Sequence, residues 1–565
     1  MSALNAEYKW VIAEENREPV RAMAKALRVP GIVAQLLHAR GIETKEEAKA
    51  FLEPMQAPLS DPFELTDMDL AVDRLGQARD RGEHVRVFGD YDVDGMAATA
   101  ILSRGLRRYG IEHISCRMPN RLTDSYGITP AAVEQANRDG VDVLVTVDNG
   151  ISALDAAEAA KGLGIDLIIT DHHHINGELP DAHAVINPKR DDPASPFRHA
   201  CGAALAFKLS WALTGSPADF DIAAVATIAD VVPLLAENRS LVDKGLRELA
   251  EGTHLGLDAL VHKAGISARG IRAESVAFQL APRINACARL GNPQKGLELF
   301  LADSEEEAGL IASELDAANV ERRRIEALIL EEAKQEVEAT LTDGQRTIVL
   351  AREAWHPGVI GIVAARLQSA YWRPVVMITI DEHGRGRSSC RSTPDFNIVE
   401  ALGECAHLLV QYGGHRAAAG MTIERQHIAE FKEVFEREAL RSAPAEDPLR
   451  RELRIDALLA LSEIDGDLLR AIDMLEPFGH ENPAPVFASC GVTVVPGSVR
   501  VLRGGHLKFT VTQGGRAFDA IGFNLAERFA GRDIANEIDL AYCPKFNTWR
   551  GVTTIQLEVK DLRPS

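Results

Sequence analysis

The sequence lacks the features of an exported or membrane-embedded protein. The amino terminus has no basic start followed by an apolar core, and no run approaches the ~20 apolar residues of a membrane span. The seven cysteines include no Cys-x-x-Cys pair and leave an odd number, which argues against a disulfide framework or a zinc ribbon. We therefore expect a cytoplasmic protein with reduced thiols and no membrane partner.

Basic charge is also scarce. The chain has 62 Lys and Arg against 83 Asp and Glu, a formal net charge of −21. This balance speaks against a nucleic-acid partner, because non-specific affinity comes mostly from Lys and Arg that neutralise phosphates. Net charge does not report distribution, so a basic groove on an acidic protein stays open.

At 565 residues the chain is too long for one core, and three or four domains are expected. Its 46% apolar and 26% charged residues are typical of a globular protein. The patterns predict an α/β multidomain protein. Its expected parts are a helical lead-in (1–60), a parallel-sheet domain (61–240), a helical connector (241–340), a smaller α/β domain (341–445) and a β-barrel (446–565).

Chemistry-bearing residues follow successive apolar strands of the first domain, where alternating strands and helices predict a parallel sheet. They are Asp90, Asp92 and Asp94 after the first strand, Asp148 after another, and Asp171, His172 and His173 after the next; Asp230 ends an apolar helical run. Strand ends of a parallel sheet share one edge, so we expect a cluster. Carboxylates with imidazoles suit Mn²⁺ or Mg²⁺ better than zinc, and two such ions support in-line attack on phosphorus.

The aspartate run has two simpler interpretations. Asp-x-Asp-x-Asp-Gly also opens an EF-hand loop, but position twelve is Ile101 instead of Glu, and a strand precedes the loop. A merely solvated acidic turn is the other reading, and it stays open for this segment alone.

Several segments resemble a known family. DYDVDG, VTVDNGIS, TDHHH and TIADVVPL, in this order, resemble the signature segments of the DHH phosphoesterase superfamily. PNRLTDSYG, PRINACARLG, YGGHRAAAG and LEPFGHENPAPVF resemble, more narrowly, the RecJ-type single-stranded-DNA-specific exonucleases. The similarity covers nearly the whole chain. It implies a DHH domain over 61–240, a DHH-associated domain over 341–445 and an OB-fold over 446–565.

The resemblance also implies two divalent cations, Mn²⁺ or Mg²⁺. Asp92 and Asp148 would hold one, and Asp94, Asp148, His172 and Asp230 the other. His173 would face the scissile phosphate, and Asp171 would orient the histidine pair. Many relatives carry His where Phe88 stands, and we expect Asp90 to supply the missing ligand.

DNA contacts are implied in the same way. Arg121, Arg289, Ser389 and Arg391 would bind a 5′ phosphate, Tyr126 would stack on a base, and His415 would help to hold the nucleic-acid end. Cys390 stands where relatives usually carry Gly and is expected to narrow the pocket. The expected OB-fold contacts are Lys508, Lys545, Phe546, Trp549 and Arg550, which interleave basic and aromatic residues.

The function implied is a monomeric 5′→3′ exonuclease that releases 5′-mononucleotides from single-stranded DNA in repair and recombination. A single-strand-binding protein and a helicase are expected partners. Two alternatives remain open. Some DHH relatives cleave very short oligonucleotides, cyclic dinucleotides or pyrophosphate, and these tend to lack a carboxy-terminal barrel. A degenerate, inactive DNA-binding scaffold is the other alternative, and the intact acidic and histidine set argues against it.

Overall fold

The computed structural model describes residues 8–13, 17–122, 124, 127–442, 451–526, 537–549 and 551–564. The chain divides into two compact units. We call Glu53–Ala327 with Pro477–Asn482 the central unit, and Met1–Leu52, Leu328–Glu476 and Pro483–Ser565 the composite unit. Within the described ranges, no helix is long and apolar enough to cross a membrane.

The central unit contains a five-stranded parallel sheet in the order β3-β2-β4-β5-β6. Its strands are β2 (Val85–Phe88), β3 (Ile114–Arg117), β4 (Val143–Val147), β5 (Asp166–Thr170) and β6 (Ala184–Ile186). The strands β2 and β4 are buried along their whole length, as expected for a parallel sheet covered on both faces. The predicted α/β architecture is confirmed.

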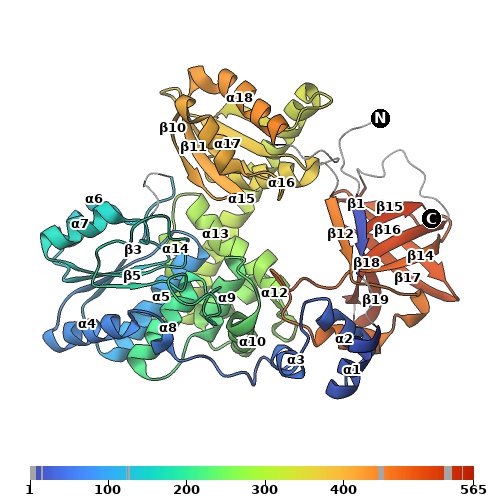
Figure 1. Ribbon diagram of the computed structural model, residues 1–565, viewed down its shortest axis with the longest axis horizontal. Coiled ribbons are helices and arrows are strands. Elements are labelled where there is room, and N and C mark those ends of the chain that lie inside the picture. The colour runs from blue at the N-terminus through green and yellow to red at the C-terminus, as the bar shows by residue number, and fades with distance from the viewer. Residues whose placement is uncertain are drawn as a thin grey trace. The chain divides into compact units, whose positions relative to one another are not determined.

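Two sets of helices cover this sheet (Figure 1). One core joins one face to α4 (Met68–Arg81), α5 (Val93–Tyr109) and α8 (Gly202–Thr214), and another joins the opposite face to α6 (Pro130–Arg138) and α7 (Leu154–Leu163). The first core continues through α9 (Phe220–Ala229), α10 (Ala236–Glu251), α11 (Leu255–Lys263), α12 (Ala273–Ser275), α13 (Ala281–Arg289) and α14 (Gln294–Leu301). Because the sheet is parallel, the carboxyl ends of all five strands lie along the same edge, and helices cover both faces of the sheet.

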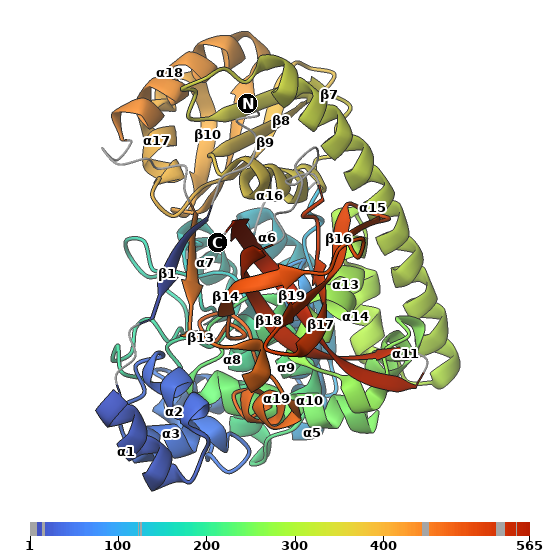
Figure 2. The ribbon, with the colours of Figure 1, turned by 90° about the vertical axis from the view of Figure 1, so that its right-hand side faces the viewer.

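A single long helix, α15 (Glu305–Thr340), follows (Figure 2). The sequence allowed one helix or two with a bend, because the stretch has no Pro and one Gly. The structure shows one uninterrupted helix of 36 residues.

The composite unit holds a mixed sheet in the order β10-β11-β9-β8-β7. Its elements are β7 (Ile348–Glu353), α16 (Ile360–Tyr371), β8 (Val375–Ile380), β9 (Arg385–Arg391), α17 (Ile398–Glu404), β10 (Leu409–Gly414), β11 (Ala418–Glu424) and α18 (Ile428–Arg441). The core between this sheet and α17 and α18 includes Phe431 and Phe435, whose rings stack.

The same unit ends in a seven-stranded sheet that closes into a barrel through pairing of β14 with β16. Its strands are β13 (Ala457–Leu458), β14 (Phe487–Val494), β15 (Arg500–Leu502), β16 (His506–Gln513), β17 (Arg516–Gly522), β18 (Glu537–Trp549) and β19 (Val552–Pro564); α19 (Gly466–Asp473) lies between β13 and β14 in the chain. The sequence indicated five or six strands. The two shortest, β13 and β15, have too few residues to show alternation.

The lead-in contains the predicted helices α1 (Arg17–Leu27), α2 (Gly31–His38) and α3 (Lys45–Leu52). It also contains a strand that was not predicted, β1 (Tyr8–Ile12), which pairs in parallel with β12 (Arg451–Ile455). The five residues of β1 form a strand by pairing with this distant segment. The local sequence pattern therefore does not predict the strand.

Gly245 tests the packing of α10 on α9. A Cβ at this position would lie 2.1 Å from the Phe220 carbonyl oxygen and 2.4 Å from Ala224 Cβ. We expect Gly245→Ala to lower the free energy of unfolding by about 1–3 kcal/mol, because the two helices must separate. Gly309→Ala in α15 is the matched control, since its Cβ would meet no described atom within 4 Å. Equal melting curves for the two variants would contradict this packing.

Candidate metal centre

Two aspartates are held at helix starts. Asp92 is the N-cap of α5, and its Oδ1 accepts hydrogen bonds from the backbone N–H of Asp94 (3.0 Å) and Gly95 (3.2 Å). The Asp94 carboxylate accepts the N–H groups of Gly202 (2.7 Å) and Ala203 (2.8 Å) at the start of α8. Unpaired N–H groups and the helix dipole stabilise carboxylates at such positions. Both side chains are therefore fixed by the backbone.

Asp148 occupies a strained turn after β4. Its φ of 62° lies in the left-handed region, where Asp and Asn occur more readily than other side chains. Its N–H donates to the Thr170 carbonyl (3.0 Å), which continues the pairing of β4 with β5. Gly202 is required opposite, because a Cβ there would lie 2.5 Å from Asp148 Cβ. The turn and the close approach of α8 together fix the carboxylate.

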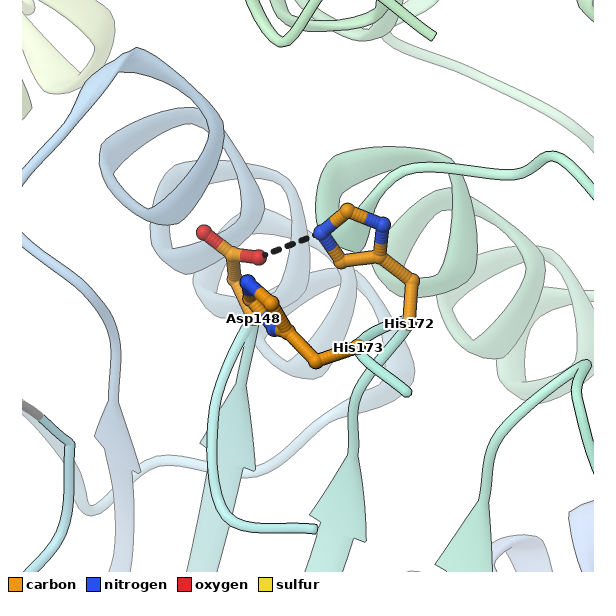
Figure 3. Close-up of side chains that lie close together, drawn as sticks. All are labelled: Asp148, His172 and His173. Carbon is orange, nitrogen blue, oxygen red and sulfur yellow. Dashed lines mark ion pairs between the residues drawn. The ribbon is translucent and has the colours of Figure 1, made fainter. Parts of the chain in front are cut away.

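The His172 imidazole reaches three carboxylates. Its Nε2 lies 3.1 Å from Asp148 Oδ1, 3.7 Å from Asp94 Oδ2 and 3.7 Å from Asp230 Oδ2. Figure 3 shows Asp148, His172 and His173 converging beyond the ends of neighbouring strands. Neighbouring ligands of an octahedral ion with bonds of about 2.1 Å are themselves about 3 Å apart. These separations fit donors that share a coordination sphere.

Three groups of donor atoms each lie within 4.8 Å of one another. They are Asp148, His172 and His173; Asp94, His172 and Asp230; and Asp90, Asp92 and Asp148. Asp148 and His172 belong to two groups each, so the groups form one continuous cluster. The structure thus brings together every metal-ligating residue that the sequence predicted.

The carboxylates crowd one another in a buried place. Burial and the charge of Asp92 raise the pKa of Asp90 well above the usual value, and burial and the charges of Asp94 and Asp92 do the same for Asp148. Burial and the charges of Asp94 and Asp92 raise the pKa of Asp230 to about 9. Burial lowers the pKa of His172 to about 4, so its imidazole is neutral at pH 7. Negative charge confined in this way favours binding of a cation.

Two buried oxygens support the same conclusion. Asp90 Oδ1 and Asp148 Oδ1 are buried and accept no hydrogen bond from the described residues. A buried carboxylate oxygen without a partner costs free energy unless a cation or donor satisfies it. The oxygen-rich set with a neutral imidazole matches Mn²⁺ or Mg²⁺. The residues present therefore fit divalent cations.

His173 is oriented by Asp171. His173 Nδ1 lies 2.7 Å from Asp171 Oδ1, and the same carboxylate accepts the N–H groups of His173 (3.1 Å) and Ile151 (2.8 Å). Burial alone would lower the pKa of His173, but the bond to Asp171 and its charge raise it overall. Burial alone would raise the pKa of Asp171, but the His173 bond lowers it. The pair favours a protonated imidazole beside the carboxylate cluster.

Tyr91, which the sequence analysis did not single out, links the cluster to two predicted arginines. The Arg121 guanidinium lies 4.9 Å from the centre of the Tyr91 ring. Burial and Asp90 raise the pKa of Tyr91 to about 12, while the charges of Arg121 and Arg289 oppose that rise. Arg121 therefore lies over the Tyr91 ring, and Arg289 is close enough for its charge to act on the Tyr91 hydroxyl. Tyr91 stands between the predicted ligands Asp90 and Asp92 in DYDVDG, and this position could have indicated its place at the site.

Two further positioning residues follow β6. Lys189 Nζ donates to the His172 carbonyl, and Asn187 Nδ2 donates to the His173 carbonyl (3.1 Å). They stand at the carboxyl end of a strand in the same sheet, as the predicted residues do. Extending the strand-end rule to AVINPK would have found them.

In the composite unit, Ser389 and Arg391 lie on β9, and Arg391 Nη1 donates to Ser389 Oγ (3.2 Å). Gly361, in α16, is close enough that a Cβ would lie 2.8 Å from Ser389 Oγ and 3.4 Å from Arg391 Nη2. Cys390 is fully buried in the core on the other side of the strand. The expectation that Cys390 narrows this site is therefore wrong, because successive side chains alternate between faces.

The remaining predicted DNA contacts lie on separate elements of the composite unit. His415 is in the turn between β10 and β11, and its N–H donates to the Ala418 carbonyl (2.8 Å). On the barrel, Lys508 pairs with Asp519 (3.1 Å) and Lys545 with Glu558 (2.7 Å).

Phe546 is exposed, and strand alternation places it on the face opposite Lys545. Tyr126, Arg550 and the side chain of Trp549 lie outside the described residues.

Sequence profiles of three domains match the chain. They are the DHH family, N-terminal domain (residues 84–232), the DHHA1 domain (344–440) and the RecJ OB domain (455–561).

Similar proteins share nearly the full length. The single-stranded-DNA-specific exonuclease RecJ of Bacillus subtilis is 34% identical over 99% of this chain and 71% of its own length. That of Escherichia coli is 32% identical over 95% of this chain and 96% of its own. The crystal structure of Thermus thermophilus RecJ in complex with Mn²⁺ superimposes with a TM-score of 0.85 at 32% identity, covering 99% of this chain and 80% of that one. A Mg²⁺ complex of the same protein gives 0.78 at 31%, covering 99% and 79%.

The charge cluster predicts a pH-dependent effect of Asp230→Asn in metal-free protein. Asp230 has a pKa of about 9 when folded and about 3.9 when unfolded. The folded state thus favours the protonated carboxyl, whose stabilisation is complete below about pH 4 and is lost as the pH rises towards 9. Asparagine does not ionise.

In EDTA, we expect Asp230→Asn to raise the free energy of unfolding more at pH 8.5 than at pH 5, by at least about 1.4 kcal/mol, the equivalent of one pKa unit. Denaturant unfolding at both pH values measures it. Asp395→Asn, at an exposed position, serves as control. An equal gain at the two pH values would refute the repulsion between these carboxylates.

Proposed function

Because the chain belongs to the RecJ family of single-stranded-DNA-specific exonucleases, we propose that it degrades single-stranded DNA from the 5′ end, releasing 5′-mononucleotides by metal-dependent phosphodiester hydrolysis. The observation that carries this proposal is the cluster of three donor groups around Asp148 and His172. DNA repair and recombination are the processes in which such an activity is used.

We assign the donors to two divalent cations, Mn²⁺ or Mg²⁺. Asp90, Asp92 and Asp148 would hold one, and Asp94, Asp148, His172 and Asp230 the other. Asp90 is included because its buried Oδ1 has no donor among the described residues and Phe88 packs in the core. When bound, two such cations supply an activated water and neutralise charge on the phosphate during in-line displacement.

The chain's own groups complete the chemistry. His173, oriented by Asp171 and with its pKa raised, donates a proton or a hydrogen bond to a phosphate oxygen as negative charge develops there. His172 stays neutral and keeps its Nε2 lone pair available, since burial lowers its pKa to about 4. Lys189 holds the carbonyl of His172 and thereby the direction of its ring.

Asp148→Asn tests the proposal. This substitution keeps the shape of the side chain and removes its charge, so we expect the rate of digestion to fall by at least about 10²-fold. Oligonucleotides labelled at the 5′ or the 3′ end, with Mn²⁺ or with EDTA, measure the rate, the polarity and the metal requirement together. Asp192→Asn, at an exposed position of the same unit, should digest at the parent rate.

The parent should release a labelled mononucleotide from the 5′ end at once and from the 3′ end only late. Duplex with blunt ends should resist. Equal digestion of both strands of a blunt duplex, or full activity of Asp148→Asn, would refute the proposed function.

We further propose where the DNA is held. In the central unit, Arg121 and Arg289 bind phosphate at the 5′ end of the DNA, and Tyr126 stacks on a base. In the composite unit, Ser389 and Arg391 bind the 5′ phosphate and His415 assists, because a guanidinium beside a hydroxyl offers matched donors to phosphate oxygens. Lys508, Lys545, Phe546, Trp549 and Arg550 of the barrel contact bases and phosphates of the strand.

We propose the domain boundaries that the sequence predicts: lead-in 1–60, DHH domain 61–240, connector 241–340, DHH-associated domain 341–445 and OB-fold 446–565. The acidic net charge makes local basic groups decisive for DNA affinity. We propose that the protein acts as a cytoplasmic monomer. A helicase and a single-strand-binding protein would supply its substrate.

Arg391→Ala tests recognition of the phosphate. We expect the KM for a 5′-phosphorylated oligonucleotide to rise about tenfold or more, since charge-assisted hydrogen bonds are lost. The KM for the same strand with a 5′ hydroxyl should change little. Arg385→Ala, on the same strand but exposed and paired with Glu424, is the control. An equal loss on both substrates would show that Arg391 does not read the terminal phosphate.

A further inference from the structure

The segment Pro477–Asn482 belongs to the central unit, although the residues on both sides of it belong to the composite unit. It lies within LEPFGHENPAPVF, a motif that the proposed chemistry leaves without a role. Its neighbour in the central unit is the loop that follows Asp230. This contact is the subject of our inference.

Direct hydrogen bonds join the segment to that loop and to α10. The Leu234 N–H donates to the His480 carbonyl (3.0 Å), and the buried Arg239 Nη1 donates to the Pro477 carbonyl (3.2 Å). Asn482, which has no exposed surface, donates from Nδ2 to the same Pro477 carbonyl (2.9 Å). Asn482 also exchanges backbone hydrogen bonds with Gly479. The segment is therefore a closed loop with a buried polar core.

Packing adds to these bonds. Leu234 is buried, and a Cβ on Gly479 would lie only 2.5 Å from Leu234 Cδ1. A side chain at position 479 would push Leu234 out of place. Glycine at position 479 thus leaves the space that the Leu234 side chain occupies.

The backbone on both sides of this contact is strained. Val231 (φ 59°) and Ala236 (φ 45°) lie at the two ends of the loop after Asp230, and Glu481 (φ 58°) lies in the segment. Left-handed backbone is a true outlier for a β-branched residue such as Val231, whose side chain is mostly exposed and gains little by packing. Such conformations persist only where surrounding contacts over-determine them.

A second anchor connects the loop to the residues that precede α8. Asn238 Nδ2 donates to the carbonyls of Pro233 (3.0 Å) and His199 (2.7 Å). His199 lies just before α8, whose first N–H groups bind Asp94. The loop after Asp230 is thus held between α8 and the segment 477–482.

From these contacts we infer that Pro477–Asn482 is a positioning clamp for Asp230: it imposes the strained loop conformation that aims this carboxylate at His172 and Asp94. The inference rests on the proposed role of Asp230 as a metal ligand. Asn482, Gly479 and Arg239 are positioning residues, because they act through Leu234 and its loop. A loop that only fills space would stabilise the fold without changing metal affinity.

Asn482→Ala in the full-length protein tests the clamp, with Mn²⁺ alone as the probe. Loss of the hydrogen bond from Asn482 Nδ2 should loosen the loop that carries Asp230. We therefore expect Mn²⁺ affinity to fall about tenfold, as it does when other residues that orient metal ligands are replaced. Calorimetry or the EPR signal of free Mn²⁺ measures this affinity. Binding of a single-stranded oligonucleotide in EDTA should stay at the parent level. Saturating Mn²⁺ should restore most of the nuclease rate.

Gly479→Ala provides a second variant that disturbs Leu234 without removing a hydrogen bond. Gly162→Ala is its matched control, since that added methyl meets no described atom within 4 Å. We expect Gly479→Ala to weaken Mn²⁺ binding and Gly162→Ala to leave it unchanged.

Asp230→Asn distinguishes the clamp from the proposed role of Asp230 as a metal ligand. If it weakens Mn²⁺ binding while Asn482→Ala and Gly479→Ala do not, the clamp is refuted and the metal role of Asp230 stands. If Asp230→Asn leaves Mn²⁺ binding unchanged, that metal role fails, and the clamp fails with it. A parallel loss of Mn²⁺ and EDTA-resistant DNA binding in Asn482→Ala would show a general folding defect and would also overturn the clamp.

Discussion

Repulsion among buried carboxylates is the constraint on which this molecule depends. Burial raises the pKa of Asp90, Asp148 and Asp230, and neighbouring carboxylates add to the rise: Asp92 acts on all three, and Asp90 acts on Asp148 and Asp230. Such a cluster opposes folding of the metal-free chain and becomes favourable when cations enter. The surrounding contacts hold these carboxylates together against their mutual repulsion.

The rigid scaffold supplies that restraint in layers. Helix starts bind Asp92 and Asp94, a strained turn holds Asp148, and the loop after α9 holds Asp230. Asn149 adds a buried bridge, because its Nδ2 donates to the carbonyls of Phe88 and Val147. The ends of β2 and β4 are thereby tied together directly beneath the donors.

Sequence alone predicted the parallel sheet and the acidic cluster because both rest on local patterns: apolar strands and the residues that follow them. The predicted ligands lie together as the shared strand edge requires. Contacts set by distant partners could not be predicted. Tyr91 owes its role to arginines far along the chain, β1 to β12, and the burial of Cys390 to the face that β9 turns towards the core.

The pairing of β1 with β12 has a consequence for synthesis of the protein. Tyr8 at one end of the ribbon faces Arg451 at the corresponding position of its partner. As the chain leaves the ribosome, β1 has no partner until Arg451, 443 positions after Tyr8, has been made. The strand β1 therefore stays unpaired while all the intervening residues are synthesised, and a product that stops before Arg451 never pairs it with β12.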